Sequence, residues 1–271
     1  MLVFLKLLSE SLLSFYPAMV KYIQFPIINQ MFARFIIYTI ISLFFIDFHI
    51  ITKYILSPFG ISLALANTIH VYSSYLGFSN LESGVSYSIF YIYPLIILLL
   101  SNVKFKITYL FPIIGVLLLT HSNCKNIQNK QQFIKGTIGI IFAIITEVII
   151  YFLIKNAKYN NQWNSLFISY IIPTIILTIT LNKNIIPSNY QNNYQSNKNI
   201  LILLIANAII GAIGYYLRFY VIGKMNSGIY SVLTYFGIVM AYVYGWILNQ
   251  EKISIQKIIG SLIIVSSCLF I

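Results

Sequence analysis

Long apolar runs separated by short polar gaps occupy the whole chain. Each run has roughly the 20 residues that a helix needs to cross a bilayer. The runs lie at 2–22, 30–47, 57–78, 84–101, 105–121, 134–154, 164–182, 200–222, 228–249 and 254–271. Within a run the apolar residues are continuous, whereas the strands of a membrane barrel alternate apolar and polar positions. The pattern therefore predicts an all-α integral membrane protein with ten transmembrane helices.

Composition excludes a soluble domain. Of the 271 residues, 59% are hydrophobic and only 8% are charged, and the mean hydropathy is +0.85; soluble domains have about 25% charged residues. The net charge of +12 comes from lysines scattered through the polar gaps, a distribution typical of loops that face lipid headgroups. We expect membrane lipids and not nucleic acid as partners. Cys124 and Cys268 match no metal or redox spacing, and we expect no cofactor and no metal site.

Two offsets indicate an internal repeat. A shift of 137 residues places Glu10 on Glu147 and His70 on Asn207, and a shift of 144 residues places Ser83-Gly84-Val85 on Ser227-Gly228-Ile229 and Tyr91 on Tyr235. The two offsets differ by seven residues, so the second half has seven more residues between these points than the first half. The polar stretch 183–199 has room for them. We predict two five-helix repeats, at 1–121 and 134–271, joined by a connecting loop at 122–133. Because five is odd, the second repeat enters the membrane from the opposite side, and the two repeats are inverted, as in many transporters with a midplane substrate site.

The end of the chain resembles a known family. Tyr235-Phe236-Gly237, Gly245-Trp246, Asn249-Gln250-Glu251-Lys252 and Gly260 are similar to the final helices of the drug/metabolite transporter superfamily in its ten-helix EamA-like form. Arg34 after Pro26 resembles the family's second-helix arginine, and Tyr91-Ile92-Tyr93-Pro94-Leu95 its fourth helix. The first repeat departs from the pattern, because the equivalent of Glu251 is Ile107. Glu251 is expected to be a loop residue that caps the start of the last helix.

A second resemblance concerns Glu147. The segment from Ala143 to Ile149, with Lys155 following, is similar to the first helix of the small multidrug resistance branch of the same superfamily, whose glutamate binds protons and cationic substrates. A carboxylate at that depth is costly, so it must be protonated, paired or hydrated. We predict substrate binding and proton coupling at Glu147; a structural pair with Arg218 or Arg34 is the alternative. Glu10 receives the same roles by the repeat, against an i,i+4 pair with Lys6 at the interface.

The remaining candidates are polar and aromatic. His70 and Asn67 lie on one face of the third predicted helix, Asn207 takes the repeat position of His70, and Tyr91 and Tyr235 are repeat partners that can stack on a ligand. These five join Glu10 and Glu147 as predicted substrate-binding residues. Arg34 and Arg218 lie near the ends of their runs, and we expect them to anchor at the interface, with a clamp on a substrate carboxylate or phosphate as the alternative.

These patterns favour one function. No nucleophile constellation, phosphate-binding loop or soluble ATPase domain is present in the sequence, so we expect no enzyme but a secondary active transporter of a small polar metabolite. Amino acids, nucleoside-like compounds and S-adenosylmethionine-like compounds are the candidate substrates, with transport driven by a gradient or by exchange. The alternatives are efflux of cationic drugs and a non-transporting membrane scaffold. We expect a multi-pass protein of a bacterial inner membrane, of undetermined oligomeric state.

Overall fold

The protein is all-helical wherever its structure is described. The structure is a computed structural model that describes residues 1–23, 25–101, 111–121, 130–180, 194–252 and 254–269. Its helices are α1 (Leu2–Leu13), α2 (Phe15–Ile23), α3 (Ile27–Leu43), α4 (Phe48–Tyr54), α5 (Pro58–Asn80), α6 (Ser83–Phe90), α7 (Tyr93–Leu100), α8 (Phe111–His121), α9 (Lys130–Lys155), α10 (Gln162–Thr180), α11 (Tyr194–Ile222), α12 (Ser227–Thr234), α13 (Phe236–Asn249) and α14 (Ile255–Leu269).

Each of the ten apolar runs of the sequence contains helix among the residues that the structure describes. Three runs are broken helices: α1 and α2 meet at Ser14, α6 and α7 at Tyr91 and Ile92, and α12 and α13 at Tyr235. By length and composition, six described helices or broken helices are able to cross a membrane. They are Leu2–Ile23, Ser83–Leu100, Lys130–Lys155, Gln162–Thr180, Lys198–Ile222 and Ser227–Asn249. The pair α4 and α5, bent by 88°, makes a seventh if it is one span.

The helices turn apolar residues outward and polar residues inward. On α9 the large side chains of Ile138, Phe142, Ile145 and Ile149 are about half exposed, whereas Glu147 on the opposite face is buried. This arrangement is the reverse of a soluble helix, and it suits a helix whose outer face contacts lipid. The polar core that results holds the residues described in the next subsection.

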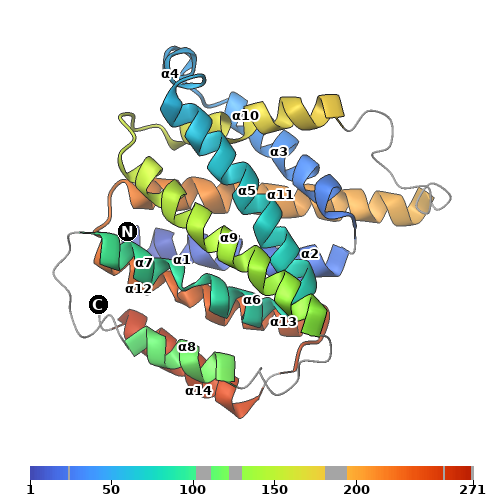
Figure 1. The fold of residues 1–271 in the computed structure, drawn as a ribbon, viewed down its shortest axis with the longest axis vertical. Coiled ribbons are helices and arrows are strands. Elements are labelled where there is room, and N and C mark those ends of the chain that lie inside the picture. Colours follow the sequence, from blue (N-terminus) through green and yellow to red (C-terminus); the bar gives the residue numbers. More distant parts are fainter. Residues whose placement is uncertain (24, 102–110, 122–129, 181–193, 253, 270–271) are drawn as a thin grey trace.

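Helix packing follows a regular scheme. α5 packs along α9 and α1 along α11, while α3 packs on α10 and α8 on α14; the broken helices α6/α7 and α12/α13 also lie against each other. Figure 1 shows α8 and α14 together at the lower end and α3, α4 and α10 toward the upper end, with α1, α5, α9 and α11 between them. These four central helices carry most of the buried charges.

Glycines set the close crossing of α5 and α9. A Cβ atom at Gly139 would lie 2.7 Å from the Ser73 carbonyl oxygen and 3.1 Å from the Gly77 backbone nitrogen. Both neighbours are backbone atoms of α5, so they cannot rotate away. Small residues at such crossings let helix backbones approach closely, which membrane helices use because lipid provides no hydrophobic drive for their association.

We expect Gly139→Ala to lower the thermal stability of the detergent-solubilised protein, by a free energy of about 1–3 kcal/mol, because α9 must shift away from α5. Gly223→Ala is the control, since the nearest atoms to its Cβ lie at 3.9 Å. A fluorescence-based melting curve of both variants checks this. Equal melting temperatures for the two variants would show that α5 and α9 do not pack as closely as described.

Candidate functional site

Arg218 of α11 is the centre of a buried charge network. The residue is 1% exposed. Its Nη1 donates a hydrogen bond of 2.7 Å to Oε1 of Glu147 on α9, and its Nη2 donates to both carboxylate oxygens of Glu10 on α1, at 3.1 and 3.0 Å. One guanidinium therefore joins two carboxylates from helices that are far apart in the sequence.

The Glu10 carboxylate has two further partners. Lys6, one turn earlier on α1, places its Nζ 2.5 Å from Oε1, and the Tyr91 hydroxyl donates to Oε2 at 2.5 Å. The Lys6 ammonium also lies 3.4 Å from the centre of the Tyr230 ring, a cation–π contact. Lys6 and Glu10 are both fully buried. Two cations, Lys6 and Arg218, thus hold Glu10 together with Tyr91, which lies at the break between α6 and α7.

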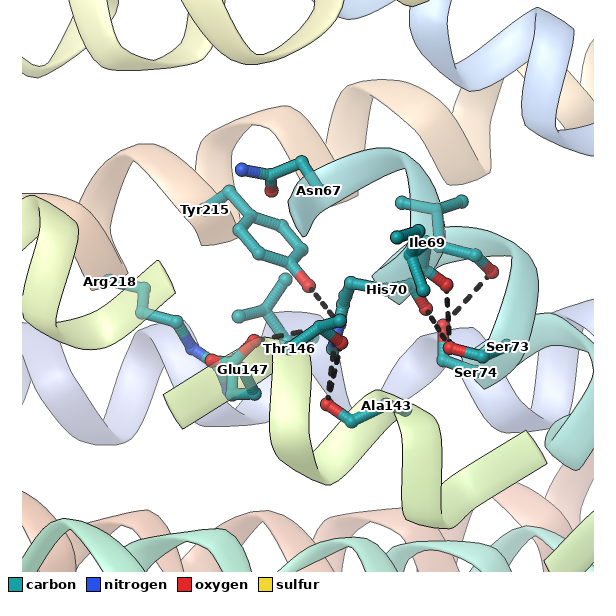
Figure 2. A network of polar contacts seen from close by, with 12 residues as sticks. Asn67, Ile69, His70, Ser73, Ser74, Ala143, Thr146, Glu147, Tyr215 and Arg218 are labelled. Carbon is teal, nitrogen blue, oxygen red and sulfur yellow. Dashed lines mark hydrogen bonds and ion pairs between the residues drawn. The ribbon is translucent and has the colours of Figure 1, made fainter. Parts of the chain in front are cut away.

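Glu147 is less completely paired than Glu10. Its Oε1 binds Arg218, but its buried Oε2 has no hydrogen-bond partner among the described residues, and Nε2 of His70 lies 3.5 Å from it. Figure 2 shows Glu147 between Arg218 and His70, with Tyr215 above them. The free oxygen of Glu147 faces the imidazole ring of His70.

The surroundings of His70 fix its tautomer. Its Nδ1 lies 3.2 Å from the Ala143 carbonyl oxygen, which only accepts hydrogen bonds, so Nδ1 carries the hydrogen. In the neutral ring Nε2 is then an acceptor, and the Tyr215 hydroxyl at 3.2 Å donates to it. Nε2 and the Glu147 Oε2 are then two acceptors that face each other. One added proton at this point would join them by a hydrogen bond.

The charges of the network balance. Lys6 and Arg218 oppose Glu10 and Glu147, and an isolated charge in a low-dielectric interior costs several kcal/mol. Because each charge has an opposite charge beside it, these residues can stay buried inside a membrane protein. In the part of the chain that the structure describes, no three His, Cys, Asp or Glu side chains gather as a metal site.

A second buried arginine lies beyond Tyr215. Arg34 of α3 is 2% exposed, and its Nη2 donates to the Tyr170 hydroxyl at 3.0 Å. Its guanidinium carbon lies between 4.7 and 5.8 Å from the centres of five tyrosine rings, those of Tyr16, Tyr38, Tyr75, Tyr170 and Tyr215. We call these five rings the tyrosine cage. Tyr215 belongs both to the cage and, through His70, to the charge network.

The structure brings together four of the predicted site residues. Glu10 and Tyr91 are hydrogen-bonded to each other, and His70 lies beside Glu147; Arg218 links the two pairs. The ion pair between Glu147 and Arg218 that the sequence allowed as an alternative is present. The i,i+4 pair of Lys6 and Glu10 is also present, but it is buried, so its expected interface position is wrong.

The other three candidates lie apart from the ion pairs. Asn67 donates to Ser169 at 3.1 Å and accepts from Tyr170 at 3.3 Å, which places it beside the tyrosine cage. Asn207 is buried, with no hydrogen-bond partner for its side-chain oxygen among the described residues. The Tyr235 hydroxyl is likewise buried without a described partner, and its ring lies 6.5 Å from that of Tyr91.

The expectation for the two arginines is wrong. Both Arg34 and Arg218 are buried in the protein and do not anchor at the interface. Position within an apolar run was a poor guide, because it says nothing about which face of the helix an arginine occupies. Two further tyrosines contact the charges of the network: Tyr230 lies under the Lys6 ammonium, and Tyr215 lies beside the Arg218 guanidinium. Tyr215 precedes Arg218 by three residues, a spacing that puts both on one helix face, whereas no sequence pattern indicates Tyr230.

Glu251 caps a different helix from the one expected. It accepts hydrogen bonds from the Ser83 backbone nitrogen at 2.8 and 3.1 Å and from the Ser83 hydroxyl at 2.8 Å, and it lies 3.5 Å from the Lys21 ammonium. Its carboxylate thus stabilises the N-terminus of α6, where the helix dipole favours negative charge. Ile107, the position that the predicted repeat aligns with Glu251, lies outside the described residues.

The comparison with protein families decides the identity. The EamA-like transporter family matches residues 134–271, which is half of the chain. The chain belongs to the EamA-like transporter family. The resemblance read from the last helices is thereby confirmed, and the protein is a multi-pass membrane protein of the transporter type found in this family.

Solved structures support the fold. Nineteen chains of known structure match this one. One of them, a crystal structure of a protein, superposes with a TM-score of 0.69 over 98% of this chain and 94% of its own, at 13% sequence identity. This match covers both ends of the EamA-like protein, including the part before residue 134, and at that identity it speaks for the fold alone. No curated protein sequence matches the chain significantly.

Removal of the central guanidinium tests the charge balance. We expect Arg218→Gln to lower the free energy of unfolding by about 3–5 kcal/mol, because Glu10 and Glu147 would remain buried without their shared partner. The double variant Arg218→Gln with Glu147→Gln should recover part of this loss, since one stranded carboxylate is removed. Melting curves in detergent measure both, with Lys158→Gln on an exposed lysine as the control. If the double variant is as unstable as the sum of the two single variants, Arg218 and Glu147 are not coupled.

Proposed function

We propose that this EamA-like protein is a secondary transporter of a small polar metabolite, driven by a gradient or by exchange. The observation that carries the proposal is the pairing of Arg218 with both Glu10 and Glu147. Ionisable residues inside a membrane protein are costly to maintain, and they mark substrate and ion pathways by default. A scaffold would gain more stability from apolar residues of the same volume.

The proposed architecture has ten spans in two inverted five-helix halves, 1–121 and 134–271. Three features support it. First, exchange of the halves turns the α5–α9 contact into the α1–α11 contact, and both exist. Second, α3 with α10, α8 with α14, and α6/α7 with α12/α13 are contacts between equivalents. Third, the repeat partners Tyr91 and Tyr235 both lie at helix breaks, and Ser83 and Ser227 both begin helices.

The network lies between the proposed halves. Glu10 belongs to the first half, whereas Glu147 and Arg218 belong to the second. Alternating access by a rocking of two halves requires contacts that break and re-form around a central site. In the proposal, the hydrogen bonds between Arg218 and Glu10 are among the contacts that exchange, and ligand groups replace them during the transport cycle.

The unpartnered polar atoms support a polar ligand. Asn207 and Tyr235 each keep a buried oxygen without a described partner, and buried polar atoms are otherwise almost always hydrogen-bonded. Glu10, Asn67, His70, Tyr91, Asn207 and Tyr235 together with Glu147 are the residues that we propose to bind substrate. Amino acids, nucleoside-like compounds and S-adenosylmethionine-like compounds all present the hydrogen-bond donors that these acceptors would need.

Proton coupling is proposed for Glu147, with Glu10 as its counterpart in the first half. The free Oε2 of Glu147 faces Nε2 of His70 at 3.5 Å, so a proton has two acceptors at that point. A proton on Glu147 would weaken its ion pair with Arg218 and free the guanidinium for other contacts. Glu10 is bound to Lys6, Arg218 and Tyr91, so both of its carboxylate oxygens already have partners. The membrane of residence is proposed to be a bacterial inner membrane.

Uptake into proteoliposomes tests the function. With a metabolite mixture of radiolabelled amino acids, nucleosides and S-adenosylmethionine, we expect wild-type vesicles to accumulate at least one compound, faster under an imposed proton gradient. Glu147→Gln should abolish the effect of the gradient while leaving exchange of preloaded compound, because a glutamine cannot take up the proton. Glu82→Gln, the same substitution at an exposed glutamate, is the control.

Three results would contradict parts of this proposal. No accumulation and no exchange of any compound by the folded wild type rejects transport of these metabolites. A gradient effect that survives Glu147→Gln rejects the role of Glu147 in coupling. Transport of cationic dyes with no transport of the metabolites would favour drug efflux instead.

A further inference from the structure

Arg34 is a buried cation without a counter-ion. Of the ion pairs among the described residues, none includes Arg34. The five acidic residues of the chain are all described: Glu10 and Glu147 bind Arg218, Glu251 caps α6, and Asp47 and Glu82 are exposed. The buried Nε of Arg34 also has no hydrogen-bond partner in the described part of the chain.

The tyrosine cage stabilises this cation only in part. Ring faces attract a guanidinium, and each contact contributes about 0.5–2 kcal/mol depending on desolvation. Tyr170 accepts one hydrogen bond from Arg34 and passes its own hydrogen to Asn67, while Tyr16 and Tyr38 bond to each other at 2.6 Å. The rings therefore hold the guanidinium in place but supply no negative charge. An anion that bound next to Arg34 would therefore supply the missing counter-charge.

The charge network beside Arg34 would give a bound ligand a preferred orientation. Its four formal charges cancel, so Arg34 leaves one positive charge unbalanced in the core. Tyr215 connects the two regions: its ring centre lies 4.7 Å from the Arg34 guanidinium carbon, and its hydroxyl binds His70 beside the free oxygen of Glu147. A group that can bind an anion, Arg34, and a group that can bind a cation, the free oxygen of Glu147, are thus both linked to Tyr215.

We propose that Arg34 binds the carboxylate of a zwitterionic metabolite whose amino group points toward Glu147. The single unbalanced charge matches a monoanion better than a doubly charged phosphate, and a guanidinium with a free Nε edge suits a carboxylate. This inference rests on the proposed transport function and narrows its substrate class to compounds that carry a carboxylate and an ammonium group, with α-amino acids as the simplest case.

Ligand binding to the purified full-length protein tests the inference. Thermal stabilisation in detergent is measured with the twenty proteinogenic L-amino acids and S-adenosylmethionine, and then with the carboxamide of each compound that stabilises. Inorganic phosphate and phosphoserine form a separate arm. In the wild type we expect at least one carboxylate to bind, and its carboxamide to bind about tenfold or more weakly, because the amide loses the charge-assisted hydrogen bonds.

Two substitutions of Arg34 complete the test. Arg34→Gln should remove the preference for carboxylate over carboxamide, and Arg34→Lys should keep a reduced preference, since the lysine retains charge but lacks the fork. Neither should lower the melting temperature of the ligand-free protein as Arg218→Gln does, because no buried carboxylate loses its partner. Arg34→Lys also serves as the second variant if Arg34→Gln fails to fold.

Each contrary outcome is decisive. No stabilisation by any carboxylate, equal binding of carboxylate and carboxamide, an unchanged preference in Arg34→Gln, or stronger binding of phosphate compounds would overturn the inference. The outcome is distinguishable from that of the transport proposal. Carboxylate binding that depends on Arg34 without vesicle uptake would reject transport and retain the site, whereas uptake without carboxylate preference would reject the site and retain transport.

Discussion

The pairing of Arg218 with Glu10 and Glu147 is the interaction on which the interior of this protein depends. Charged groups at membrane depth persist only when paired or hydrated. A single guanidinium here satisfies two carboxylates at distances between 2.7 and 3.1 Å. Because the carboxylates come from α1 and α9, the same contacts also position those helices against α11. Arg218 therefore couples the charge of the carboxylates to helix packing. A change in the protonation of Glu147 would alter contacts that hold α1, α9 and α11 together.

The rest of the fold places this network where it can act. Small residues such as Gly139 let α9 approach α5, which carries His70 against Glu147. Apolar residues face outward, so the polar interior lies among helices and away from lipid. The helix breaks at Ser14, Tyr91 and Tyr235 interrupt three apolar helices next to or near the network. Irregular backbone at membrane depth is tolerated where it is buried in protein or lines a watery path, and broken helices are common at transporter binding sites.

Sequence patterns predicted the helices well because apolar runs are local features. They also predicted Glu10 and Glu147 as a pair, through the repeat. They did not place Arg34 or Arg218, because an arginine near the end of a run can either reach the interface or turn inward, and the choice depends on helix rotation and on partners distant in sequence. Glu251 is a similar case: its partner Ser83 lies 168 residues away, and no local pattern records that contact. Length and composition support six or seven spans among the described helices, so the count of ten spans stays a prediction from the apolar runs.

The central claim is that the buried network lies on a path that opens to both sides of the membrane. Ser14, at the break between α1 and α2, is fully buried and donates a hydrogen bond to the Glu10 carbonyl oxygen. The direct measurement is the labelling of Ser14→Cys, in a background with Cys124 and Cys268 replaced by serine, by a membrane-impermeant thiol reagent in vesicles of each orientation. The account predicts labelling from both sides, reduced by a transported compound. Absence of labelling from both sides, or labelling from one side alone, would contradict it.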